Sequence, residues 1–294
     1  MKIVSSQHIY SMSRENKPVM TVNPGETIMF HTKDCFGNQL EEPGACIGQL
    51  DWEHINPAAG PVYVEGAQKG DVLKVEILTI ETSECGTMCA LPGDGVLGKY
   101  VKEEQIKRLP VRDGQVIFND TIQFPLKKMI GVIGVAPQEG RVPCGTPGKH
   151  GGNMDNTRIG EGAVLYLPVF CPGALFALGD VHAAMGDGEI MVSGVEISAK
   201  VTVKLDLIKD RSIQEPMLED ARCCYTISSH ESVETAVQSC TQAMSLILQE
   251  RLGLSGNEAG MLMSAVGDLR FCQVVDPKRT VTMAMPKEIL PHIF

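Results

Sequence analysis

The sequence predicts a mainly β fold, with a body of sandwich or barrel type and an appended α+β C-terminal segment. Short stretches that alternate apolar and polar residues recur from Ile3 to about Asp210, as is typical of strands that bury one face. Thirty glycines and seventeen prolines supply frequent turns. Helical spacing begins only after about residue 216. Because the strands lack intervening helices, a sandwich or barrel is favoured over a parallel α/β sheet.

Two alternating stretches give the clearest strands of the body. Residues 72–78 alternate as a half-buried strand should, and residues 194–207 do so over a longer run. Turn-forming residues occupy positions 23–25, 112–114 and 186–188. We therefore expect many short strands joined by tight turns.

The first helix is predicted by a capping motif and by apolar periodicity. Ser228-x-x-Glu231 has the pattern of a capping box. Apolar residues then recur at helical spacing from residue 233 to residue 248, and Gly253 favours an end to the helix.

A shorter helix and a hairpin follow. Ser255-x-x-Glu258 has the same capping pattern and opens an apolar segment toward Val266. Residues 271–275 and 280–285 are β-rich runs on either side of a turn, which predicts a hairpin.

We therefore divide the chain into two parts. Residues 1–215 form a β-rich body that carries the proposed metal site. Residues 216–294 form helices and a hairpin that pack on the body.

Charge and cysteine usage exclude several protein classes. The net charge of −10, from 26 basic and 36 acidic residues, argues against a nucleic-acid partner. The most apolar segment, residues 163–178, is short for a membrane span and contains prolines. Residues 1–8 do not resemble a secretory signal, and the ten cysteines form no pair of CxxC knuckles. We expect reduced thiols, no membrane partner and a cytoplasmic location.

The densest group of metal-binding residue types lies between residues 149 and 189. Asp180 and His182 are two residues apart, so an extended chain places both side chains on one face. A carboxylate and an imidazole are a usable pair of metal ligands, and Asp155 and Glu189 add carboxylates nearby. The alternative is an exposed turn with a solvated pair.

Two earlier segments add candidates. Asp34 follows an apolar strand, and His54 precedes a loop, although a lone histidine is more often a core or surface residue.

No phosphate loop, G-x-S-x-G elbow or dinucleotide fingerprint is present. Cys144 or Cys171 stays open as a nucleophile, without neighbours that mark either thiol as activated.

Several stretches taken together resemble the acetamidase/formamidase family, from about residue 18 to about residue 290. They are Gly151-Gly152-Asn153-Met154-Asp155, residues 162–169, Gly179-Asp180-Val181-His182-Ala183-Ala184-Met185-Gly186-Asp187-Gly188-Glu189, residues 56–67 and residues 131–137. The resemblance implies hydrolysis of short aliphatic amides to a carboxylate and ammonia. It also implies a β-sandwich body, a homodimer or higher homo-oligomer, and a bound divalent metal.

The resemblance also assigns the site residues. The positions that match acidic and histidine site residues of the family are Asp34, His54, Asp155, Asp180 and His182. Glu189 matches the trailing carboxylate, which we expect to move a proton between water and the departing nitrogen.

The remaining roles concern the oxyanion, the substrate and the metal. Lys149 or backbone amides of the Gly-rich stretch would stabilise the oxyanion, and Gly151, Gly152 and Asn153 would bind substrate. Oxygen and nitrogen ligands suit zinc, with calcium as the alternative. Two other functions stay open: hydrolysis of another small C–N substrate such as a cyclic amide, and non-catalytic binding of a small ligand or metal.

Overall fold

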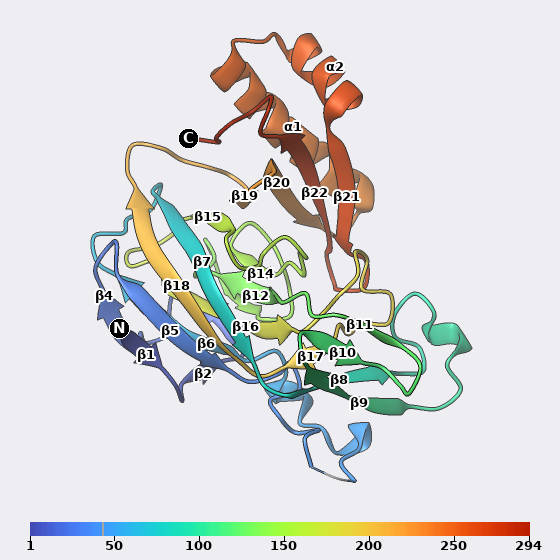
Figure 1. The fold of residues 1–294 in the computed structure, drawn as a ribbon. Coiled ribbons are helices and arrows are strands. Elements are labelled where there is room, and N and C mark those ends of the chain that lie inside the picture. Colours follow the sequence, from blue (N-terminus) through green and yellow to red (C-terminus); the bar gives the residue numbers. More distant parts are fainter. Residues whose placement is uncertain (43) are drawn as a thin grey trace.

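A computed structural model describes residues 1–42 and 44–294, which build two large β-sheets and a small one (Figure 1). The first large sheet has nine strands within the described residues. In spatial order they are β1 (Lys2–Val4), β5 (Thr27–Thr32), β18 (Ala199–Ile208), β7 (Val72–Thr82), β15 (Val164–Pro168), β19 (Met217–Glu219), β20 (Cys223–His230), β22 (Arg279–Pro286) and β21 (Asp268–Gln273).

The second large sheet has eleven strands in the same described ranges. Its main path is β11 (Gln123–Pro125), β10 (Gln115–Ile117), β9 (Gln105–Arg112), β8 (Cys85–Ala90), β17 (Glu196–Ile197), β16 (Phe176–His182), β12 (Met129–Gly134) and β14 (Gly151–Asn153). A branch from β16 adds β6 (Ala58–Val64), which pairs with β2 (His8–Ile9) and β4 (Met20–Val22). The small sheet pairs β13 (Arg141–Pro143) with β3 (Ser11–Ser13). Three short 3-10 helices are Ile47–Gln49, Trp52–His54 and Gly98–Tyr100.

The main core lies between the two large sheets. Phe30 of β5 and Phe176 of β16 meet edge to face, with ring centroids 5.7 Å apart. Both belong to one buried apolar cluster that draws side chains from strands of both sheets. The predicted sandwich body is therefore confirmed, and in the described residues neither large sheet closes into a barrel. The nine-stranded sheet ends at β1 and β21, and the branched eleven-stranded sheet ends at β11, β14, β2 and β4.

The long alternating run at residues 194–207 forms two strands instead of one. β17 pairs with β16 and β8 in the eleven-stranded sheet, whereas β18 pairs with β5 and β7 in the nine-stranded sheet. The chain thus crosses from one sheet to the other at Ser198. Alternation reports which side chains share a face, but it does not report which sheet a strand joins.

The C-terminal part extends the nine-stranded sheet and covers it with two helices, α1 (Val233–Leu252) and α2 (Gly256–Val266) (Figure 1). β19 pairs with β15 of the body, and the predicted hairpin is β21–β22. A second apolar cluster lies under α1. In the described residues, neither helix is long and apolar enough to cross a membrane.

The helix caps are partly as predicted. Ser255 and Glu258 form the expected capping box, and Gly253 ends α1 in the left-handed conformation. The box at Ser228 is wrong, because Ser228 lies within β20 and the N-cap of α1 is Ser232. Ser228 pairs across strands with Val281, so its backbone is committed to the sheet.

The hairpin β21–β22 reaches back to the body next to the proposed site. The Gly188 amide donates to the Cys272 carbonyl at 2.8 Å, and the Val274 amide donates to the Gly188 carbonyl at 3.2 Å. The loop that carries Glu189 is therefore held by the C-terminal part.

Candidate metal centre and active site

Neighbouring strands of the eleven-stranded sheet place a histidine among carboxylates. Asp180 and His182 end β16, and Glu196 of β17 lies directly opposite His182 in the strand pairing. Cross-strand partners have Cβ atoms roughly 5 Å apart, which brings these side chains together. All three are buried.

His182 Nε2 is the centre of this group. It lies 3.0 Å from Glu196 Oε2, 3.4 Å from Asp180 Oδ1 and 3.8 Å from Asp155 Oδ1. Glu189 completes the set, because its carboxylate, that of Asp155 and the His182 ring each offer a ligand atom within 4.8 Å of the others. These five residues are called the carboxylate cluster below.

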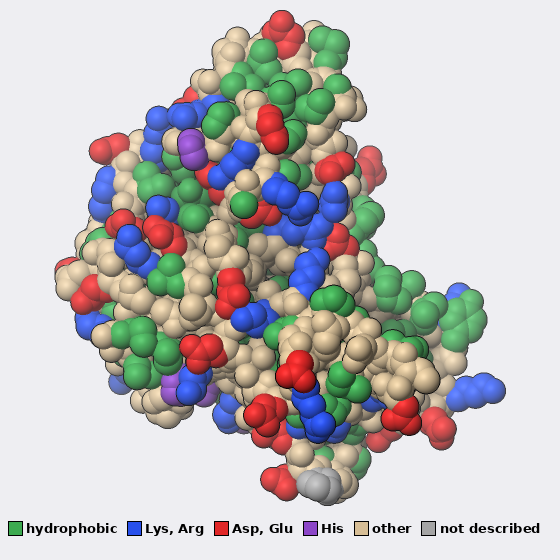
Figure 2. All heavy atoms as spheres, viewed as in Figure 1, with side chains coloured by type: hydrophobic (Ala, Val, Ile, Leu, Met, Phe, Trp, Pro, Cys, Tyr) green, Lys and Arg blue, Asp and Glu red, His purple; other side chains and the backbone are tan. Residues whose placement is uncertain are grey.

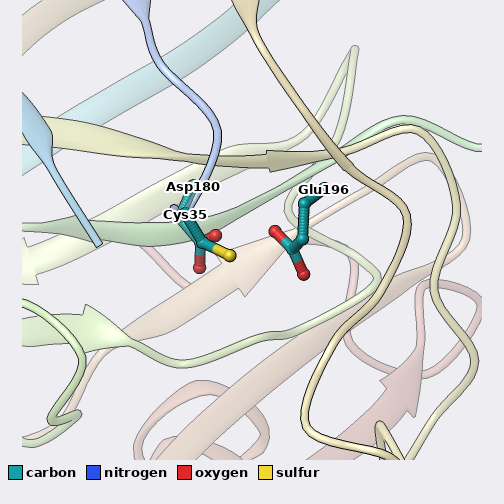
Figure 3. A group of neighbouring side chains, drawn as sticks. All are labelled: Cys35, Asp180 and Glu196. Atoms are coloured by element: carbon teal, nitrogen blue, oxygen red, sulfur yellow. The ribbon is translucent and has the colours of Figure 1, made fainter. Parts of the chain in front are cut away.

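A second ligand group is continuous with the first. Cys35 Sγ and carboxylate oxygens of Asp180 and Glu196 lie within 4.8 Å of one another. Figure 3 shows Glu196 pointing toward Asp180 and Cys35 from the opposite side. Because Asp180 and Glu196 also approach His182, the two groups form one site with oxygen, nitrogen and sulfur donors.

Three carboxylate residues of the cluster have an uncommon backbone conformation. Asp155, Asp180 and Glu189 have φ angles of 42°, 55° and 48°, in the left-handed region that such residues rarely adopt. Strained backbone of this kind persists only where the surrounding structure holds it, and it is concentrated at functional sites.

Gly131 of β12 provides the space for two of these side chains. A Cβ atom at this position would lie 2.4 Å from Asp155 Oδ1 and 2.5 Å from Asp180 Oδ2. The Gly131 carbonyl also accepts hydrogen bonds from the Met154 and Asp155 amides, at 3.1 and 3.4 Å. A glycine is therefore required where β12 passes the site.

Burial and mutual repulsion make the cluster electrostatically unfavourable without a cation. Burial raises the pKa of Asp155 well above its usual range, and the Glu189 and Asp180 carboxylates raise it further. Burial, opposed by His182, also raises the pKa of Glu196 to about 7. For His182, burial lowers the pKa, but Glu196 and Asp180 outweigh that effect and hold it well above the usual value.

These residues fit a divalent metal. In the described part of the chain, several buried atoms of the cluster have no hydrogen-bond partner: both Asp155 oxygens, Asp180 Oδ1, both His182 ring nitrogens and Glu196 Oε2. Buried polar groups normally have partners, so atoms of this kind indicate an unaccounted ligand. Carboxylate, imidazole and thiolate are the donors that zinc takes in proteins.

Two predicted ligands lie apart from the cluster. The Asp34 carboxylate is buried, which raises its pKa to about 6, and its Oδ1 accepts a hydrogen bond from the Asn38 amide at 2.6 Å. His54 is half-exposed, with Nδ1 2.5 Å from Asp51 Oδ2 and its ring against Tyr10. The structure thus uses Asp34 to shape the turn that carries Cys35, and it does not bring His54 to the other ligands.

The predicted oxyanion and substrate residues have mixed positions. Lys149 is exposed and lies near Glu215, where its charge opposes the rise in pKa that burial gives that carboxyl. Gly151 and Gly152 have φ angles of 91° and 82° and let the chain approach β12 closely. Asn153 is buried, and its Oδ1 has no hydrogen-bond partner among the described residues.

Sequence reasoning missed Glu196, Cys35 and Gly131. Glu196 occupies a polar position in the alternating run, where a solvent-facing side chain is expected, and only the strand pairing reveals its burial. Cys35 looked like an ordinary buried thiol. Gly131 opens one of the stretches that carry the family resemblance, but spacing alone does not show which carboxylates it faces.

A cavity of about 480 Å³ adjoins the cluster. Glu189 belongs both to its wall and to the cluster. Gly194, also in the wall, approaches His182 so closely that a Cβ there would lie 2.6 Å from Nδ1. A small molecule in this cavity would therefore contact Glu189 at the edge of the carboxylate cluster.

Comparisons with known proteins find similar structures and sequences over nearly the whole chain. An acetamidase from Bacillus halodurans is 41% identical, with 98% of each chain covered and a TM-score of 0.96. A predicted acetamidase/formamidase from Thermoanaerobacter tengcongensis is 45% identical, with 99% of this chain and 97% of that one covered and a TM-score of 0.96. The formamidase of Methylophilus methylotrophus is 24% identical over 92% of this chain and 86% of its own length.

Two further relatives match over a smaller part of their length, and the family model matches nearly the whole chain. The chain spans less than two thirds of two further curated relatives, 64% and 63% of their lengths. The model of the acetamidase/formamidase family matches residues 13–142 and 140–292, which is nearly the whole chain. The chain therefore belongs to the acetamidase/formamidase family.

Proposed function

We propose that this chain is a metal-dependent amidohydrolase that converts short primary amides, of the formamide and acetamide type, to a carboxylate and ammonia. Hydrolysis of linear amide C–N bonds follows from family membership. The metal dependence rests on one observation, a buried histidine among four carboxylates, four of whose eight oxygens lack hydrogen-bond partners in the described residues.

Five side chains would hold the metal: Cys35, Asp155, Asp180, His182 and Glu196. Sulfur and imidazole donors favour zinc over calcium, which prefers oxygen ligands throughout. When bound, the metal would polarise the amide carbonyl and lower the pKa of a bound water.

Glu189 is the residue we assign to proton transfer. Glu189 is the residue of the cluster that also lines the 480 Å³ cavity, which would place it next to both water and substrate. In hydrolysis, the water oxygen bonds to the acyl carbon while Glu189 takes a proton from it. The C–N bond then breaks, and Glu189 returns the proton to the departing nitrogen.

For the oxyanion, the exposed position of Lys149 favours the alternative of backbone amides. Gly131 and Gly194 bring their backbone close to side chains of the cluster, because neither carries a Cβ atom. Backbone amides fixed by strand pairing need no reorganisation when negative charge develops.

We also propose a homo-oligomer in the cytoplasm. All ten cysteines are free thiols, which fits a reducing compartment.

Figure 2 shows hydrophobic side chains gathered over the C-terminal part at the top of the view. Exposed apolar residues there include Met261, Leu269 and Phe271, and such patches often mark subunit contacts. Light scattering coupled to gel filtration would test the oligomeric state.

The experiment that tests the function combines elemental analysis with ammonia release. We expect purified protein to contain zinc and to release ammonia from formamide or acetamide, and we expect chelation to abolish the release. The His182→Ala variant should lose both metal and activity. A metal-loaded preparation that releases no ammonia from any amide would overturn the proposal.

A further inference from the structure

The cavity beside the cluster is larger and more apolar than a formamide or acetamide site needs. Of its fifteen lining residues nine are apolar, two are glycine and four are polar or charged. The side chains that give it this character include Met88, Phe118, Phe124, Met185, Met191 and Val195. Its volume of about 480 Å³ falls in the range, about 300–1,000 Å³, of pockets that enclose drug-sized ligands.

Two of the four polar or charged residues in the wall form hydrogen bonds elsewhere. Ser193 Oγ accepts a hydrogen bond from the Cys89 amide at 3.2 Å. Asp187 forms a two-pronged pair with Arg158, at 2.7 and 2.9 Å. Lys127 is exposed. Glu189 is the polar lining residue that also belongs to the carboxylate cluster, so it would orient a ligand beside the cluster, and most of the remaining wall offers apolar contact.

We propose that this cavity binds the acyl substituent of the substrate, so that the enzyme also hydrolyses primary amides of apolar acids with longer aliphatic or arylalkyl chains, and does so with a higher kcat/KM than for the short amides of the proposed function. This inference rests on the proposed function. The nitrogen of a primary amide carries only hydrogens, so any apolar group must be on the acyl carbon. With the carboxamide at Glu189, the chain extends from the cluster into the cavity.

The lining favours a range of chain shapes over one rigid substituent. Three of the lining side chains are methionines, which are unbranched and adapt to irregular partners. Phe118 and Phe124 lie in the segment around the β10–β11 turn and supply flat apolar surface. Burying each further methylene should therefore increase kcat/KM about three- to fourfold until the cavity is filled.

The test measures ammonia release from formamide, acetamide, butanamide and hexanamide by the metal-loaded protein. We expect kcat/KM to rise along the series. If the short amides release ammonia but kcat/KM stays constant or falls as the acyl chain lengthens, the acyl pocket is wrong. The proposed function would still stand. No ammonia from any of the four would overturn the proposed function itself.

Two variants locate the effect in the cavity. Phe124→Ala removes apolar wall and Met191→Trp narrows the space, so each should lower the hexanamide-to-acetamide ratio of kcat/KM at least threefold. Ile122→Ala is the matched control, because Ile122 is exposed in the same hairpin and does not line the cavity. If kcat/KM rises with acyl chain length but the hexanamide-to-acetamide ratio is the same in the parent and all three variants, the acyl chain binds outside this cavity. That result would refute the proposal.

Discussion

At the scale of single residues, a substitution of Glu189 can show whether proton transfer and metal binding depend on different side chains. It lines the cavity, whereas Asp180, His182 and Glu196 lie deeper in the cluster. We predict that Glu189→Gln keeps the metal but lowers kcat about 10²- to 10⁴-fold, the usual contribution of a general acid–base group. Elemental analysis and ammonia release measure the two effects.

The control for this variant is Glu65→Gln, since Glu65 is an exposed carboxylate outside the cluster. It should leave both metal content and turnover at the parental level. A Glu189→Gln protein that turns over like the parent would remove Glu189 from the proposed mechanism.

Gly131 gives a second prediction at this scale. In Gly131→Ala the new methyl group would collide with Asp155 and Asp180, so we expect loss of most bound metal and at least a tenfold drop in activity. The fold should survive, as judged by circular dichroism. Gly48→Ala is the control, because a Cβ there meets nothing within 4 Å. Full metal content in Gly131→Ala would show that the site relaxes around the added methyl.

The sequence allowed prediction of part of the site and not the rest, for a physical reason. Asp155, Asp180, His182 and Glu189 were expected together, and the structure brings them together. Glu196 joins them through strand pairing between β16 and β17, which depends on contacts far apart in the chain. A local pattern carries no information about such pairing.

At the scale of elements, Glu219 of β19 binds residues that follow β22 through a hydrogen bond and an ion pair. Its Oε1 accepts a hydrogen bond from the Ile293 amide at 2.8 Å, and its Oε2 lies 3.1 Å from Lys287 Nζ. Burial alone would raise the pKa of Glu219, but these partners outweigh burial and lower it below the usual value. The carboxylate therefore stabilises the folded protein in its ionised form.

This anchor predicts a pH-dependent difference in stability. Because the pKa is lower in the folded state, the contribution is present above the unfolded-state value of about 4.5 and is lost as the pH falls through the folded value. Glu219→Gln should cost about 1–3 kcal/mol at pH 7. Urea unfolding of parent and variant at pH 7 and at pH 4 measures it, and an unchanged gap at pH 4 would contradict this account.

Element prediction succeeded where local chemistry decides and failed where pairing decides. The capping box at Ser255 and the end at Gly253 depend on neighbouring residues only, and both are confirmed. The Ser228 motif satisfies the same local rule, but β20 needs that residue for pairing with β22. The passage of the chain from one sheet to the other at Ser198 could not be predicted for a similar reason. The alternation of apolar and polar residues continues through Ser198.

At the scale of the whole molecule, the metal should stabilise the fold as well as the reaction. The cluster lies between strands β12, β16 and β17 and the loop held by β21, so a bound metal would link distant parts of the chain. A ligand at a hundredfold excess over Kd stabilises by about 2.7 kcal/mol. We predict that chelation lowers Tm by about 5 °C or more.

Re-addition of metal distinguishes the two candidate ions. Zinc should restore both Tm and ammonia release, because Cys35 and His182 supply sulfur and nitrogen donors. Calcium should restore neither at the same concentration. Recovery with calcium alone would show that the carboxylates are sufficient ligands.

The contact between Gly188 and the β21–β22 hairpin also sets an order of events during synthesis. A ribosome makes residues 1–197, which contain every ligand of the cluster, before it makes residues 268–286. Domains fold as they emerge, so the sheets of the body can form while the Glu189 loop still lacks its support. The loop that carries Glu189 therefore gains its support from the hairpin only after every residue of the cluster has been made.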